Sequence, residues 1–209
     1  PTVAVIQAHA FGGGLELAAA CDIEYFEGGF SLATRDGRIQ VRRTAHPKQR
    51  RADAAHELVH ALGHRQGFEE KIRHYHAVSE ELTENMDEHL EEIVDHGMDL
   101  LLMPDVLVKE VLEEHGLTAQ AVWELSEYGW ASLELALRRL VHFKEGIPCA
   151  GFLSKGNYVQ FAIGNYYHPF YKGQRLPEPH IREESGITLF SVPDSRVVIG
   201  FLELPTNGA

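Results

Sequence analysis

A histidine pair with helical spacing constrains this chain more than any other feature. Residues 56–60 read His-Glu-Leu-Val-His, inside a segment from about residue 51 to residue 65 whose apolar side chains recur on one helical stripe. Side chains four positions apart lie on one face of a helix, so His56 and His60 can reach a single metal ion. The spacing therefore predicts a helix that carries two metal ligands.

Glu57 lies beside that face, where a carboxylate can take a proton from a water molecule on the metal. Zinc suits two neutral imidazoles plus a carboxylate, and its bound water has a pKa of about 7. We therefore interpret Glu57 as the candidate general base. The chain holds 13 histidines, seven of them between positions 56 and 96, so a helix with two surface histidines is the alternative interpretation.

A site with two histidines needs a third protein ligand from another part of the chain. A second expected helix, residues 86–102, offers Glu91 and, one turn later on the same face, Asp95. Glu91 could bind the metal, and Asp95 could accept the N–H of a ligand histidine, which would fix its tautomer. By spacing alone, Glu88 and Glu92 are alternatives to Glu91, and the acids could also form a solvated face.

The remaining pattern predicts an α+β protein in three parts. Residues 1–104 form the main domain, residues 105–145 a helical region, and residues 146–209 a segment rich in strands, in which six of the nine prolines fall. Thr118 is a candidate helix N-cap. Helices are expected at about 15–23, 51–65, 86–102, 105–115, 119–127 and 132–143; strands at 30–34, 38–43, 158–163, 187–192 and 196–204, the first two as a hairpin.

Composition and charge exclude several classes of protein. The 209 residues contain no apolar run long enough to span a bilayer, and the first ten residues lack the basic start of a secretory signal. Two cysteines, Cys21 and Cys149, rule out a disulfide framework and favour a cytoplasmic location. The net charge of −12 disfavours binding to nucleic acid.

Three stretches resemble the ImmA/IrrE family of zinc metallopeptidases, and the resemblance covers roughly residues 15–143. Residues 55–62 read AHELVHAL where the family has an AHELGH helix. Residues 91–104 carry Glu91, Asp95 and the LLMP sequence that anchors the register, and residues 130–140 resemble a later helical segment. The chain departs from the family pattern at four positions: Val59 for glycine, Val94 for alanine, Gly97 for phenylalanine and Met98 for alanine.

The resemblance implies a zincin-like peptidase core with one Zn²⁺, followed by a helix-turn-helix-like region. When the chain is aligned with the family pattern at LLMP, the glutamate ligand of the family falls on Glu91. The expected protein is a cytoplasmic peptidase of bacteria or their phages that acts in a stress response or cleaves a DNA-binding repressor. The substrate partner would therefore be a protein, with no membrane partner and no direct binding of nucleic acid by the chain itself.

Other residues near the motif leave alternatives open. A metzincin would place a third histidine at position 66, which is Gln66, so His64 is expected at the rim of the site or in packing. A fourth protein ligand, of which His64 is the first candidate, would indicate a non-catalytic regulator whose metal is structural. Candidates for stabilising the oxyanion of the substrate, or for the rim of the site, are His64, His74, Tyr75, His76 and His89.

Two further segments invite a functional interpretation. Residues 1–22, with three consecutive glycines from Gly12, resemble the oxyanion-hole segment of the crotonase family, and we interpret this short match as coincidence. Residues 38–51 hold six basic residues and no acid, so the strand at 38–43 is a candidate edge to which an extended substrate adds.

Overall fold

The structure is a computed structural model that describes residues 22–26, 32–33, 38–42, 46–68, 70–72, 74, 85–143, 146–176 and 186–203. The chain forms two compact units, Pro1–Leu102 and Met103–Ala209. The predicted division into three parts at residues 104 and 145 stays a prediction. Residues 15–21 of the helix expected at 15–23 lie outside the described residues.

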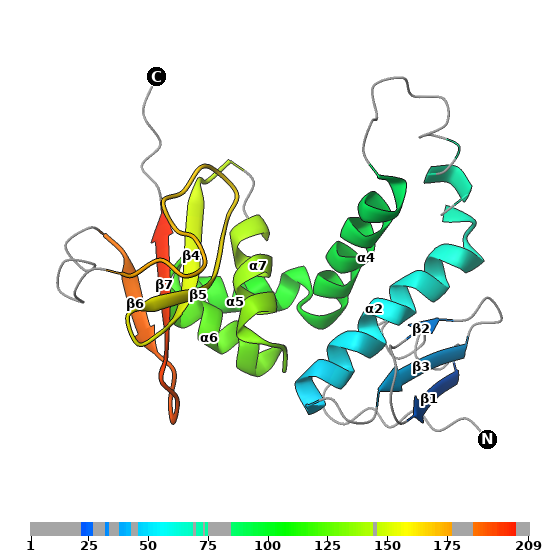
Figure 1. Cartoon of the computed structure of the whole chain (residues 1–209), viewed down its shortest axis with the longest axis horizontal. Helices are drawn as coiled ribbons and strands as arrows, with labels where there is room; N and C mark the ends of the chain where they lie inside the picture. Colours follow the sequence, from blue (N-terminus) through cyan, green and yellow to red (C-terminus); the bar gives the residue numbers. More distant parts are fainter. Residues whose placement is uncertain are drawn as a thin grey trace. The chain divides into compact units, whose positions relative to one another are not determined.

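The first unit combines a small sheet with two long helices (Figure 1). Strand β3 (Arg38–Arg42) lies between β1 (Asp22–Phe26), to which it is parallel, and β2 (Leu32–Ala33), to which it is antiparallel. Helices α2 (Pro47–Arg65) and α4 (Met86–Leu102) pack against each other, and α2 also covers β3. The core between sheet and helix contains Ile39, Val41, Leu58 and Ala61.

The sheet confirms one expectation and corrects two. The predicted hairpin is present as β2 and β3. The prediction of a helix through residue 23 is wrong at Asp22 and Ile23, which belong to β1, because parallel pairing of Ile23 with Ile39 supersedes the local pattern. The prediction that the strand at 38–43 is an edge is also wrong, because β3 is paired on both sides.

Helix α2 begins earlier than its apolar stripe indicates. Its first residue is Pro47, four positions before the expected start, where a proline loses no hydrogen bond because the first N–H groups of a helix have no partner within it. The ring nitrogen Nδ1 of His46 accepts a hydrogen bond from the backbone N–H of Lys48 at 3.3 Å. The cap and the proline therefore start the helix two turns before His56.

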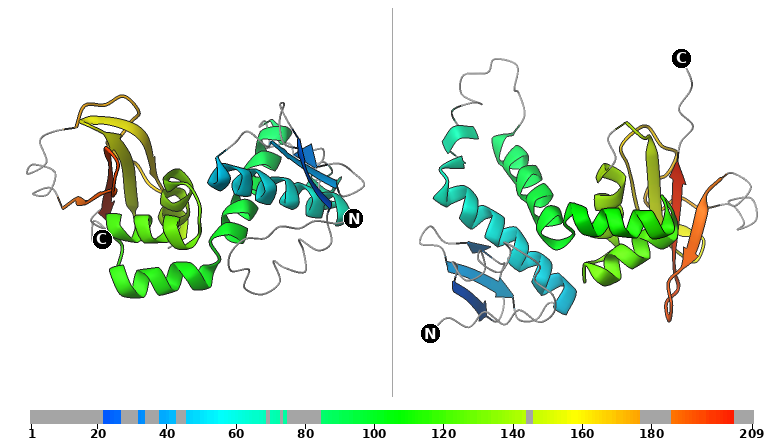
Figure 2. Two further views of the ribbon diagram at one scale, coloured as in Figure 1. Left: turned by 90° about the horizontal axis from the view of Figure 1, so that it is seen from below. Right: turned by 180° about the vertical axis from the view of Figure 1, so that it is seen from behind.

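The second unit is a helical layer on one face of an antiparallel sheet (Figures 1 and 2). Its sheet has the order β5-β4-β7-β6; α7 packs on β4 and β5, and α6 packs on β6 and β7. The elements are α5 (Asp105–His115), α6 (Ala119–Tyr128), α7 (Leu133–Phe143), β4 (Cys149–Lys155), β5 (Tyr158–Gly164), β6 (Thr188–Ser191) and β7 (Val197–Glu203).

Strand β4 is the one long element in the described part of this unit that the sequence did not predict. Its first six residues are all buried, because the strand lies in the interior of the sheet with helix α7 on one face and apolar side chains on the other. Such a strand shows no alternation of polar and apolar residues. The predicted N-cap is confirmed, since the Thr118 hydroxyl accepts a hydrogen bond from the backbone N–H of Ala121 at 3.3 Å.

A buried arginine fixes the start of this unit. Arg139 of α7 is 4% exposed, and its Nε donates a hydrogen bond to the carbonyl oxygen of Met103 at 3.0 Å. Its guanidinium also pairs with Asp105 and lies over the Phe143 ring. The LLMP sequence and the later helical segment, both singled out by the resemblance, are therefore joined at Met103 and Arg139.

We predict that Arg139→Ala lowers the unfolding free energy of this unit by about 2–3 kcal/mol, because the Met103 carbonyl loses a charged donor in a buried place. Both tryptophans, Trp123 and Trp130, lie in this unit, so urea unfolding followed by tryptophan fluorescence reports on it. Arg138→Ala, at the half-buried neighbouring position, is the control and should change the unfolding free energy less. Equal losses in the two variants would contradict this role of Arg139.

Candidate metal centre

Helix α2 brings two imidazoles together one turn apart. The ring centroids of His56 and His60 are 4.9 Å apart, with the ring planes inclined by 69°. The side chains are partly accessible, at 24% for His56 and 19% for His60. The residues on the opposite stripe, Leu58 and Ala61, are buried against β3. Packing of that stripe therefore turns both histidines away from the sheet.

Glu91 of α4 reaches both imidazoles. Its Oε2 lies 3.3 Å from Nε2 of His56, and its Oε1 lies 3.4 Å from Nε2 of His60. One ligand atom from each of these three side chains lies within 4.8 Å of the others. His56, His60 and Glu91 could therefore hold a metal ion, and they are the one such group of three among the described residues.

Asp95, one turn after Glu91, contacts the other nitrogen of the first histidine. His56 Nδ1 donates a hydrogen bond to Asp95 Oδ1 at 3.2 Å. This bond is the largest cause of a raised pKa at His56; the charges of Glu57, Glu91 and Asp95 add to it, and burial opposes it. Because Nδ1 carries the hydrogen, Nε2 of the neutral ring keeps its lone pair and faces Glu91.

Glu57 is buried, with 8% of its surface exposed, and its charge contributes to the raised pKa of His56. A carboxylate next to the ligand face of α2 can accept a proton there. The alternative ligands Glu88 and Glu92 are exposed on α4 and are absent from the group of potential ligands.

Three of the remaining candidates lie outside the ligand group. His64 on α2 and His89 on α4 are half-buried, and His74 is exposed. None of these three belongs to the group of potential ligands found among the described residues. Tyr75 and His76 lie outside the described residues.

A close contact between the two helices lies beside these ligands. A Cβ atom on Gly97 of α4 would be only 2.8 Å from Cγ1 of Val59 on α2. The resemblance noted in the sequence implies the opposite sizes at these two positions, a glycine on the first helix and a phenylalanine on the second. The sequence pointed to both residues but not to their contact. The available signal was that one of these positions is larger than the resemblance implies and the other is smaller.

Helix α7, which belongs to the region expected to resemble a helix-turn-helix, has one face buried on the sheet. It packs against β4 and β5, and its buried residues include Leu137 and Arg139. A Cβ on Gly151 of β4 would lie 2.5 Å from Cδ1 of Leu137, so sheet and helix are in close contact. A helix that enters a DNA groove needs an exposed face with positive charge.

The sequence of residues 21–141 matches the family of peptidases described as the IrrE N-terminal-like domain. The chain belongs to this family. The match includes both helices that carry His56, His60 and Glu91. None of the curated proteins compared with the chain matches it.

A solved structure with a similar fold is a Mycobacterium tuberculosis transcriptional regulator. It is 14% identical, with a TM-score of 0.54, and the similarity covers 90% of this chain and 70% of that chain. At this identity the likeness concerns the fold alone. Among the described residues, no helix has the length and apolar character required to cross a membrane.

We predict that Gly97→Ala lowers the unfolding free energy by about 1–3 kcal/mol, because the added methyl group meets Val59. Adding Val59→Ala should restore part of the loss. Hydrogen exchange of peptides from residues 47–65 and 86–102 measures the effect in α2 and α4.

Gly63→Ala on α2 is the matched control for Gly97→Ala, because the nearest atom to its added Cβ is 4.0 Å away. Alanine is the better helix former, so this variant should be neutral or more stable. Equal effects of the two alanines on exchange would show that the Val59 contact does not set the packing.

Proposed function

We propose that this protein is a zinc-dependent endopeptidase in which His56, His60 and Glu91 bind the metal. The observation that carries the proposal is the position of the Glu91 carboxylate, which lies 3.3 and 3.4 Å from the two imidazole Nε2 atoms. Membership of a peptidase family supports hydrolysis of a peptide bond as the reaction. Two neutral imidazoles and one carboxylate are one of the donor sets that catalytic zinc sites use.

In this proposal Glu57 and Asp95 have separate roles beside the metal. Zinc, when bound, would act as a Lewis acid that lowers the pKa of a water molecule and polarises the scissile carbonyl. Glu57 accepts a proton at its carboxylate as general base and returns it to the leaving amine. Asp95 holds the N–H of His56 and so keeps Nε2 available as a ligand.

The proposed substrate is a regulatory protein, such as a DNA-binding repressor, cleaved in the cytoplasm. The family resemblance supports this substrate class. A similar fold in a protein described as a transcriptional regulator is compatible with it. The net charge of −12 argues against recognition through nucleic acid.

The second candidate is a non-catalytic regulator that the metal only stabilises. His64 favours it, because this half-buried residue follows His60 by one helical turn and could supply a fourth protein ligand. A site with four protein ligands has no position for substrate, so the ligand count separates the two functions.

We predict that the purified chain binds about one zinc ion and that His56→Ala, His60→Ala or Glu91→Ala each abolishes tight binding. Metal content after dialysis, measured by atomic emission, tests this. Glu88→Ala and Glu92→Ala, exposed on the same helix, are the controls and should retain zinc. Full zinc in Glu91→Ala together with loss in either control would move the third ligand to another acid.

We also predict that Glu57→Gln keeps zinc but lowers zinc-dependent peptide cleavage by about 10²–10⁴-fold, because glutamine has the shape of glutamate but cannot accept the proton. Cleavage of a library of quenched fluorescent peptides by the zinc-loaded chain, with and without EDTA, measures the effect. Glu92→Gln serves as the control. Normal cleavage by Glu57→Gln would exclude it as the base, and no cleavage by the parent chain would favour the regulator.

A further inference from the structure

The segment after β5 carries a concentration of exposed tyrosines. Residues 165–176, here called the tyrosine loop, connect the end of β5 back to its beginning, where Arg175 pairs with Tyr158. Tyr166, Tyr167 and Tyr171 are 68%, 88% and 66% exposed. Large aromatic side chains are usually at least half buried, so three exposed ones in one short loop indicate a contact surface.

The first end of the tyrosine loop is fixed by Asn165. Its amide nitrogen donates hydrogen bonds to the carbonyl oxygens of Val141 at 3.0 Å and Ile147 at 2.9 Å. Its side-chain oxygen accepts from the backbone N–H of Cys149 at 2.9 Å. The Asn165 side chain thus links the end of α7 to the start of β4. Because Asn165 directly precedes Tyr166, these bonds also fix the start of the tyrosine loop.

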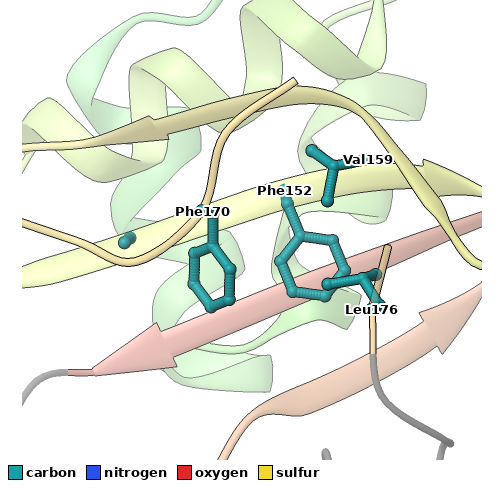
Figure 3. Packing of buried hydrophobic residues seen from close by; sticks show 5 residues of the cluster. Phe152, Val159, Phe170 and Leu176 are labelled. Atoms are coloured by element: carbon teal, nitrogen blue, oxygen red, sulfur yellow. The ribbon is translucent and has the colours of Figure 1, made fainter. Parts of the chain in front are cut away.

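The middle of the loop is fixed by packing onto the sheet. The ring of Phe170 is 8% exposed and lies 4.8 Å from the ring of Phe152, with Val159 and Leu176 beside them (Figure 3). The imidazole of His168 occupies the space above Gly164, where a Cβ would be 2.5 Å from it. The inward side of the loop therefore belongs to the core.

Hydrogen bonds also fix the turn at the far end. The N–H of Gly173 donates to the carbonyl of Val159 at 2.8 Å, and the Gln174 side chain accepts from the N–H of Tyr171 at 3.1 Å. The backbone that carries the tyrosines is therefore held in one conformation by its own unit. Because the loop backbone is already ordered, binding of a partner would cost little further conformational entropy in the loop.

The charge of the tyrosine loop is opposite to that of the chain. Residues 165–176 contain no acid, although the whole chain has 31, and both Lys172 and Arg175 are exposed. Tyrosine and arginine are the residue types that contribute most to protein interfaces, together with tryptophan. Cationic groups beside aromatic faces favour a partner with carboxylates among its apolar residues.

We propose that the tyrosine loop is a docking surface for an acidic segment of a partner protein. The surface is separate from the metal ligands, all of which lie in the other unit, and its binding does not depend on catalysis. Single-stranded nucleic acid also stacks on aromatic residues, but it needs a groove of positive charge along its backbone. Two cationic side chains in a chain of net charge −12 fit a short acidic peptide better.

Selection from a random dodecapeptide library tests the proposal on the full chain. Peptides are selected on the parent and counter-selected on the triple variant Tyr166→Ser/Tyr167→Ser/Tyr171→Ser. Affinities of the selected peptides are then measured by fluorescence anisotropy. Tyr128→Ser, at a residue of α6 that is 62% exposed, is the matched control. Circular dichroism and thermal unfolding establish that each variant is folded.

The selected peptides should be enriched in aspartate and glutamate. Their affinity should fall about tenfold or more in the triple variant and in Lys172→Glu/Arg175→Glu, and should be unchanged in Tyr128→Ser. A pool without acidic enrichment, or one that binds the folded triple variant as well as the parent, would overturn the proposal. Tighter binding of a single-stranded dodecanucleotide than of any selected peptide would overturn it in favour of nucleic acid.

Discussion

The candidate metal centre of the first unit depends on the opposition, across two helices, of imidazoles on α2 and carboxylates on α4. A hydrogen bond to Asp95 is the largest cause that raises the pKa of His56, and the negative charges of Glu57, Glu91 and Asp95 add to it. The three carboxylates form an excess of negative charge that favours the protonated form of the His56 ring. A divalent cation would relieve this excess and would use the ring nitrogens that face Glu91.

The spacing of the two helices makes this opposition possible. Glu91 reaches His56 and His60 only if α4 lies close to α2, and Gly97 removes the side chain that would hold the helices apart at Val59. The family pattern has the large and small residues the other way round. Val59 and Gly97 thus fit each other in size, which allows α2 and α4 to lie close together at this point.

The sequence was sufficient where the deciding interactions are local. Helices α4 and α5 were predicted with their observed bounds, because periodicity, Pro104 and Gly116 mark their ends. The choice of Glu91 came from the resemblance and stays a prediction as a ligand, although the structure does bring it to both histidines. Strand β1 and the central position of β3 could not be predicted, because both depend on pairing between segments far apart in the chain. Strand β4 was missed because its two faces are both buried.

The central claim is that one metal ion is held by two helices with a coordination position left for substrate. A crystal structure of the zinc-loaded chain, with the metal located by anomalous scattering at the zinc edge, tests it most directly. We expect one peak within about 2.0–2.2 Å of His56 Nε2, His60 Nε2 and a Glu91 oxygen, with a water as the remaining ligand. A peak elsewhere, or a fourth protein ligand such as His64 closing the site, would contradict it.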